Sequence, residues 1–129
     1  MKLINHETQG VEDWRQGVAT RMIASAENGS VQLCIFDQYC EPGLGAPTHL
    51  HAVEELLTVV GGRARIWVGD SEVEVGAGHS VLIPAGTKHG FRNIEKEGIL
   101  HMRATLAACI FEATYDDRAE MSRRYVPKR

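Results

Sequence analysis

The sequence predicts a single all-β domain, and three features of the chain support this class. Short segments rich in β-branched and aromatic residues recur between turns that contain Gly, Asn or Asp, a pattern typical of an antiparallel sandwich or barrel. No segment shows the strand-helix alternation of a parallel α/β sheet. The chain has 129 residues, of which 43% are hydrophobic, so it can form one domain with its own core.

The first half of the chain supplies the first predicted strands. Residues 2–5 form a short candidate strand, whereas residues 12–15 have no clear period. Residues 18–24 and 31–39 are expected to pair as a hairpin, because Asn28-Gly29 between them is a strong turn signal.

Residues 31–39 alternate between two faces, with Val31, Leu33 and Ile35 on one face and glutamines on the other. The next segment, 41–47, contains two prolines and two glycines. We therefore expect an irregular loop there.

Further strands are predicted in the second half of the chain. Their expected ranges are 55–60, 63–68, 71–75, 80–83, 88–92 and 99–106.

The C-terminal segment has a different pattern. Thr114 followed by Asp117 forms an N-cap pattern, and Glu120 and Arg124 are spaced i,i+4, as in a helical ion pair. These spacings predict a short C-terminal helix, followed by a basic tail exposed to solvent.

Residues 43–93 contain four candidate metal ligands. His49 and His51 are two residues apart, so they point to the same side of an extended backbone. Glu55 keeps this parity, whereas Glu54 points away and is expected to be a surface acid. His89 follows a Pro-x-Gly turn. Three imidazoles and one carboxylate suit Mn²⁺, Fe²⁺, Co²⁺, Ni²⁺, Cu²⁺ or Zn²⁺, whereas Ca²⁺ and Mg²⁺ prefer oxygen ligands.

These ligands lie in two motifs that resemble those of the cupin superfamily. In the first motif, Gly43, His49, His51, Glu55 and Gly62 have the spacing G-x5-HxH-x3-E-x6-G.

In the second motif, Gly78, Pro84, Gly86, His89 and Asn93 have the spacing G-x5-P-x-G-x2-H-x3-N. The resemblance implies one cupin domain over residues 1–129, with its motif core at 43–93. The implied fold is a single antiparallel β-barrel (a double-stranded β-helix, or jelly roll), and the implied cofactor is one divalent transition metal.

Several further side chains are expected to line the metal cavity. Leu57, Val59 and Phe91 share the parity of the ligands on their strands, and such an apolar wall suits a small, partly hydrophobic molecule. Trp67 either stacks in the cavity or seals a subunit interface.

The last strand, 99–106, leaves two alternatives. If its apolar face is interior, His101 is solvated, and hydrophobic patterning favours this arrangement. If its polar face lines the cavity instead, Arg103 is placed to bind an anion.

Cupins include oxygenases, isomerases, epimerases, lyases, decarboxylases and non-catalytic binders, so the resemblance does not select a reaction. The leading hypothesis is a mononuclear metalloenzyme of dioxygenase type, an oxidoreductase acting on a compact oxygenated or aromatic metabolite. Four protein ligands leave two positions of an octahedral metal open for this chemistry. The alternatives are a redox-neutral isomerase or lyase and a non-catalytic small-ligand-binding protein.

Other classes of partner are not expected. The formal net charge of −3 and the lack of a basic face argue against nucleic acid. The N-terminus has no apolar run, and no later stretch could span a bilayer, so a cytoplasmic protein is expected. Three cysteines at irregular spacing argue against a disulfide framework.

The resemblance to small cupins also implies a homodimer. The strand expected at the N-terminus and the last strand with its extension to residue 111 are the expected contact segments. Ile110 and Phe111 would otherwise leave apolar surface in water near the chain end.

Overall fold

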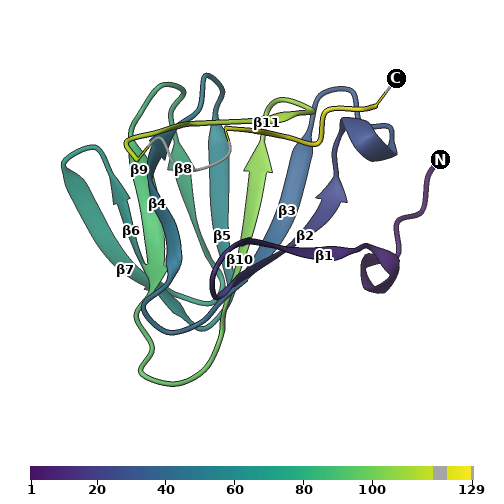
Figure 1. Ribbon diagram of the computed structural model, residues 1–129. Helices are drawn as coiled ribbons and strands as arrows, with labels where there is room; N and C mark the ends of the chain where they lie inside the picture. The colour runs from purple at the N-terminus through teal and green to yellow at the C-terminus, as the bar shows by residue number, and fades with distance from the viewer. Residues whose placement is uncertain (118–121, 129) are drawn as a thin grey trace.

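The computed structural model describes residues 1–117 and 122–128, which form two antiparallel sheets that face each other (Figure 1). The six-stranded sheet has the order β1-β2-β3-β10-β5-β8, and the five-stranded sheet has the order β12-β4-β9-β6-β7. The first sheet contains β1 (Val11–Arg15), β2 (Val18–Ala24), β3 (Cys34–Cys40), β10 (Leu100–Leu106), β5 (Glu55–Gly61) and β8 (His79–Ile83). The second contains β12 (Thr114–Tyr115), β4 (Gly45–Leu50), β9 (His89–Asn93), β6 (Arg63–Val68) and β7 (Ser71–Gly76).

Four short elements complete the description. β11 (Phe111–Glu112) pairs with β13 (Arg123–Arg124), and single 3-10 turns occur at η1 (His6–Thr8) and η2 (Ala26–Asn28). The predicted all-β jelly roll is confirmed, although its strands form two facing sheets and neither sheet closes on itself. Among the described residues, no helix has the length and apolar character needed to cross a membrane.

The core fills the space between the two sheets. Alternate residues of β10, namely Leu100, Met102, Ala104 and Leu106, point into it and are at most 3% exposed. β10 pairs with β3 along its whole length and with β5 on its other side, so a late strand occupies the middle of the larger sheet. The domain therefore forms its core only after distant parts of the chain have paired.

An aromatic cluster lies at the β1 side of this core. The Trp14 ring centroid is 4.8 Å from that of Phe36, 4.7 Å from that of Phe111 and 6.0 Å from that of Tyr125. Phe111 is only 1% exposed, so the expectation that it would leave apolar surface in water is wrong. The expected contact strand β10 is central in its sheet, and the edges of that sheet are β1 and β8.

The expected loop at 41–47 is partly wrong, because β4 begins at Gly45. A Cβ atom on Gly45 would lie 2.2 Å from the Phe91 carbonyl oxygen, so only glycine allows β4 to approach β9 this closely. The register shifts between Ala46 and His49, and Pro47, which has no N–H to donate, lies within this irregular stretch. Gly and Pro here shape a strand instead of ending it.

The predicted strand at 31–39 starts later than its apolar pattern indicates. β3 begins at Cys34, and Val31 and Leu33 are 82% and 45% exposed. The residues that face the core are those of the other parity, including Phe36 and Gln38. Cys34 and Cys40 share that parity and are buried free thiols.

Both predicted terminal elements need correction. Residues 2–5 form no strand, and the 3-10 turn η1 follows them. Thr114 begins no helix, because Thr114 and Tyr115 pair with β4, opposite Leu50 and His49. The rest of the predicted helix, at 118–121, lies outside the described residues.

A charged network covers the outer face of the larger sheet, where the carboxylate of Asp37 is only 3% exposed. It accepts hydrogen bonds from Arg103 Nε at 2.8 Å, Arg103 Nη2 at 3.0 Å and His101 Nε2 at 2.9 Å. The His101 ring lies 4.6 Å from the ring of Tyr39. Burial alone would raise the pKa of Asp37, but the hydrogen bonds from Arg103 and His101 lower it below its ordinary value of 3.8.

We predict that Asp37→Asn lowers the free energy of unfolding by about 1–3 kcal/mol, because it weakens hydrogen bonds between charged groups on a buried carboxylate. Since the folded-state pKa is lowered, the stabilisation is present above pH 3.8 and is lost as the pH falls through the folded pKa. Urea unfolding at pH 7 and at pH 3 measures both effects. Glu74→Gln, which alters the exposed Glu74–Arg65 pair, should change stability little, and an equal loss in both variants would contradict the prediction.

Candidate metal centre

Four buried side chains meet between the two sheets. His49 lies in β4, His51 follows the end of β4, His89 begins β9, and Glu55 begins β5 of the opposite sheet. Their exposed fractions are between 1% and 5%, and their candidate ligand atoms all lie within 4.8 Å of one another. The chain thus brings together the four residues that the motif spacing singles out.

The expected geometric reason for this clustering is wrong. His51 and Glu55 do not share a strand with His49, because residues 51–54 carry the chain from one sheet to the other. Glu55 therefore faces the histidines across the core instead of standing beside them. Glu54 is exposed.

Strand register places the histidines. His89 of β9 is the cross-strand partner of His49 in β4, and Tyr115 of β12 is the partner of His49 on the other side. The Gly86 N–H donates to the His51 carbonyl at 2.7 Å, which ties the turn before β9 to the end of β4. The backbone segments that carry the three histidine rings therefore lie side by side.

Each imidazole is oriented by a backbone carbonyl. The Nδ1 atoms lie 2.6 Å from the Pro47 oxygen for His49, 2.6 Å from the Glu112 oxygen for His51, and 2.8 Å from the Thr87 oxygen for His89. Because a carbonyl can only accept, Nδ1 carries the proton and each Nε2 presents its lone pair to the centre. This is the tautomer that a metal-binding histidine needs.

Electron-rich atoms face one another at this centre. His89 Nε2 lies 2.7 Å from Glu55 Oε1, and His51 Nε2 lies 3.5 Å from Glu55 Oε2. These two Nε2 atoms and Oε1 are buried, and no hydrogen bond within the described residues satisfies them. Buried acceptors without donors are costly, and three imidazoles with one carboxylate are a donor set that fits a divalent transition metal, so these residues could hold one.

The pKa shifts reflect the close contact of these groups: burial would lower the pKa of His51, but the neighbouring Glu55 carboxylate raises it. Burial, followed by the neighbouring imidazoles, lowers the pKa of His49 to about 3. Burial would raise the pKa of Glu55, but the facing imidazoles His51 and His89 outweigh it and lower the pKa to about 2. The centre therefore combines an ionised carboxylate with at least one neutral imidazole at neutral pH.

A small cavity of about 20 Å³ adjoins the cluster. Of the side chains predicted to line it, Leu57 and Phe91 do so, whereas Val59 is fully buried elsewhere in the core. His101 and Arg103 lie on the opposite face of β10, where both bind Asp37. The apolar face of β10 is thus the interior one.

Trp67 lies outside the cavity. It shares the outward parity of β6 with Arg65, and its Nε1 donates to Thr48 Oγ1 at 3.0 Å. A Cβ atom on Gly90 would lie 2.4 Å from the indole, so glycine at that position allows Trp67 to lie close against β9.

Sequence reasoning missed the polar residues of the cavity, which are Arg15, Gln38 and Tyr115. Arg15 Nη1 donates to the Gly45 carbonyl at 2.9 Å, and the Tyr115 ring lies 5.0 Å from the His49 ring. Gln38 could have been predicted, because it alternates with Cys34, Phe36 and Cys40 and therefore shares their face of the strand. No sequence pattern indicated Arg15 or Tyr115, because short edge strands contain too few residues to show a clear alternation of apolar and polar side chains. The remaining residues missed in the lining are Trp14, Phe36, Ala46, Ala104 and Phe111.

The fold and the cluster together define a cupin. The sequence model of the cupin domain matches residues 37–107, which is more than half of the chain, and the chain therefore belongs to this family. An uncharacterized protein of Streptomyces coelicolor, SCO3923, is 43% identical over 47 residues, which are 36% of this chain and 45% of that protein. The match thus spans less than half of the curated relative.

Solved structures show the same fold at low sequence identity. An RmlC-like cupin from Shewanella frigidimarina is 20% identical with a TM-score of 0.70, covering 79% of this chain and 86% of that one. The polyketide cyclase RemF from Streptomyces resistomycificus is 21% identical with a TM-score of 0.71, covering 84% and 80%. A mutant of Bacillus subtilis oxalate decarboxylase is 19% identical with a TM-score of 0.73, covering 89% of this chain and 32% of the longer enzyme.

We predict that His89→Ala weakens the binding of a divalent transition metal by more than about tenfold, since even residues behind metal ligands cost that much when changed. Glu54→Ala, one residue from Glu55 but exposed, should leave binding unchanged. Metal content after dialysis, measured by elemental analysis, distinguishes the two variants. Equal losses in both would contradict the assignment of ligands by burial.

Proposed function

We propose that this chain is a mononuclear metalloenzyme of dioxygenase type, with His49, His51, Glu55 and His89 as the ligands of one divalent transition metal. The observation that carries the proposal is the set of buried Nε2 and carboxylate atoms that face one another with no hydrogen-bond donor among the described residues. Fixed Nδ1 protons keep the three imidazoles in the ligating tautomer.

The bound metal would supply Lewis acidity and, if it is iron, the redox chemistry that activates dioxygen. The chain's own residues set the conditions for that chemistry. Glu55, ionised at neutral pH, contributes one negative charge to a divalent ion, and the cluster is almost closed to water. Low exposure strengthens each of these electrostatic interactions.

The cavity would admit a substrate only if side chains move. Its volume of about 20 Å³ holds little more than one water-sized molecule without movement of side chains. Its wall is largely aromatic and aliphatic, with Leu57 and Phe91 beside the ligands. A small aromatic or partly apolar metabolite fits this lining better than a highly charged one.

Arg15 and Tyr115 supply the polar end of the cavity. Arg15 Nη2 lies 3.4 Å from the Tyr115 hydroxyl, which orients both groups beside the histidine cluster. A guanidinium and a phenol at one end would bind and orient an oxygen substituent of the substrate while its apolar part lies against the wall. These residues would thereby select an oxygenated substrate.

The same pair favours a second candidate, a redox-neutral lyase or isomerase. Arg15 and Tyr115 could polarise a substrate oxygen with a Lewis-acid metal and without dioxygen. The names of the similar structures include both a cyclase and a decarboxylase, so the shared fold is compatible with several reactions.

Oxygen consumption tests the choice between these candidates. Protein purified without oxygen is loaded with Fe²⁺ or Zn²⁺ and screened against compact aromatic and oxygenated compounds in an oxygen electrode. We expect uptake that depends on substrate, requires Fe²⁺ and is lost in His89→Ala. Turnover of a substrate by the Zn²⁺ form without oxygen uptake would instead establish the redox-neutral alternative.

We also propose that the chain forms a homodimer through the outer face of the six-stranded sheet. Leu56 and Leu82 are cross-strand partners on β5 and β8, and they are 36% and 60% exposed. Such a pair on an outer face, with Leu82 on the edge strand β8 itself, supports a contact that covers apolar surface and a free strand edge.

We predict a dimer in sedimentation at micromolar concentration, with a buried area of roughly 1,600 Å² in total. Leu82→Glu should shift the population to monomer, because it places charges at an apolar two-fold contact. Val73→Glu, a change of similar exposure on β7 of the other sheet, should leave the dimer intact. A monomeric unmodified chain would contradict the proposal without affecting the metal centre.

A further inference from the structure

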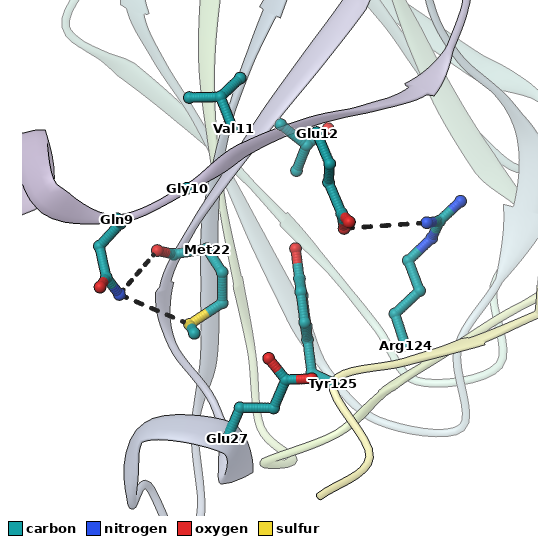
Figure 2. A pocket seen from close by; sticks show the side chains of 9 residues that line it. Gln9, Gly10, Val11, Glu12, Met22, Glu27, Arg124 and Tyr125 are labelled. Carbon is teal, nitrogen blue, oxygen red and sulfur yellow. Dashed lines mark hydrogen bonds and ion pairs between the residues drawn. The ribbon is translucent and has the colours of Figure 1, made fainter. Parts of the chain in front are cut away.

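A second hollow, much larger than the metal cavity, lies where β1, β2 and the C-terminal segment meet (Figure 2). Its volume of about 480 Å³ is within the range of small-molecule sites. None of the described residues that line this groove also lines the metal cavity. A ligand here would therefore be separate from the proposed substrate.

The hydroxyl of Tyr125 is the distinctive feature of the groove. Tyr125 is 8% exposed, and its ring packs on the aromatic cluster, 6.0 Å from Trp14. Its oxygen is buried, and no hydrogen-bond partner satisfies it within the described part of the chain. Figure 2 shows this hydroxyl pointing into the groove, towards β1. Buried hydroxyls are normally paired, so this one is available to a ligand.

The ionisation state of Tyr125 determines which hydrogen bonds its hydroxyl can make. Burial, followed by the charges of Glu12, raises the pKa of the phenol above its ordinary value of 10.0. The hydroxyl is therefore neutral at pH 7, and it can both donate and accept a hydrogen bond.

The backbone at Tyr125 is also unusual. Its φ of 65° is the only positive φ of a non-glycine residue among the described residues. A bulky residue rarely adopts this conformation, because it costs free energy. Here that conformation accompanies a buried ring whose hydroxyl lies in the groove.

The charges of the groove favour a cation. Among the described residues that line it, the charged ones are Glu12, Glu27 and Arg124, whose two carboxylates and one guanidinium sum to a net charge of −1. The guanidinium lies 4.1 Å above the Trp14 ring and 3.9 Å from Glu12 Oε1. Glu27 is exposed, and no ion pair engages its carboxylate within residues 1–117 and 122–128.

Apolar groups complete the lining. The side chains of Val11 and Met22 border the groove, and the amide of Gln9 is fixed by a hydrogen bond to the Met22 carbonyl at 3.1 Å. An aliphatic chain could lie against this wall while a charged end reaches the carboxylates.

We propose that this groove binds a small aliphatic primary ammonium compound. The ammonium group donates to the carboxylates of Glu12 and Glu27 and to the Tyr125 hydroxyl oxygen, and the alkyl chain packs against Met22 and Val11. The site is independent of the metal centre and of the reaction proposed there.

The test is an NMR titration of the full-length chain at pH 7 with n-butylammonium chloride, which is protonated at that pH. We expect saturable shifts of the backbone amides of Glu12, Thr20 and Tyr125. The neutral analogue n-butanol and the anion butyrate should bind at least about tenfold more weakly, since each lacks the charge that the carboxylates attract. Equal binding of n-butanol, or shifts confined to the metal cavity, would overturn the proposal.

Variants give an independent readout. Tyr125→Phe keeps the ring and should weaken binding roughly fivefold, the effect of one hydrogen bond. Glu27→Gln should weaken it similarly, whereas Glu54→Gln, an exposed acid outside the groove, should not.

Thermal unfolding without ligand shows whether the hydroxyl is unpaired. Because Tyr125→Phe removes a buried group that lacks a partner, the Tm should stay the same or rise. A fall in Tm would mean that the protein itself satisfies the hydroxyl. That result, or unchanged binding in Tyr125→Phe, would overturn the proposal.

Discussion

The structure depends on a buried carboxylate that faces imidazole lone pairs. Glu55 is 3% exposed, and the Nε2 atoms of His51 and His89, 3.5 and 2.7 Å from its carboxylate oxygens, lower its pKa to about 2 although burial would raise it. An isolated buried charge is costly, so a cation held among these side chains would offset the cost of burying Glu55. Since Glu55 belongs to one sheet and His49 and His89 to the other, that cation would also link the two layers.

The irregular parts of the backbone support this centre. The carbonyl of Pro47 lies in the irregular stretch of β4, that of Thr87 in the turn before β9, and that of Glu112 in the short strand β11. Each accepts from one imidazole Nδ1 and so sets both the tautomer and the direction of the ring. Irregular backbone segments usually weaken strand pairing, but here their carbonyl groups orient the imidazole rings of the candidate ligands.

Trp14 lies between the metal cavity and the larger groove. Its ring lines the metal cavity, and Arg124, which lines the larger groove, stacks on it at 4.1 Å. The buried hydrogen bond from Gln38 Nε2 to Thr20 Oγ1, 3.1 Å long, likewise joins a residue of the cavity to one of the groove. The hollows thus share a wall while their lining residues differ, so each can have its own ligand chemistry.

The sequence by itself determined the strand-rich class, most strand positions from residue 55 onward, and the types of the candidate ligands at 49, 51, 55 and 89, because periodicity and spacing are local properties. The tertiary structure decided which face of a strand packs inward: Phe36 and Gln38 enter the core, although Val31 and Leu33 indicated the other parity. It also paired Thr114 with β4 and placed Glu55 opposite His49. Parity fixes which residues share a face, but strand pairing between distant segments decides what that face meets.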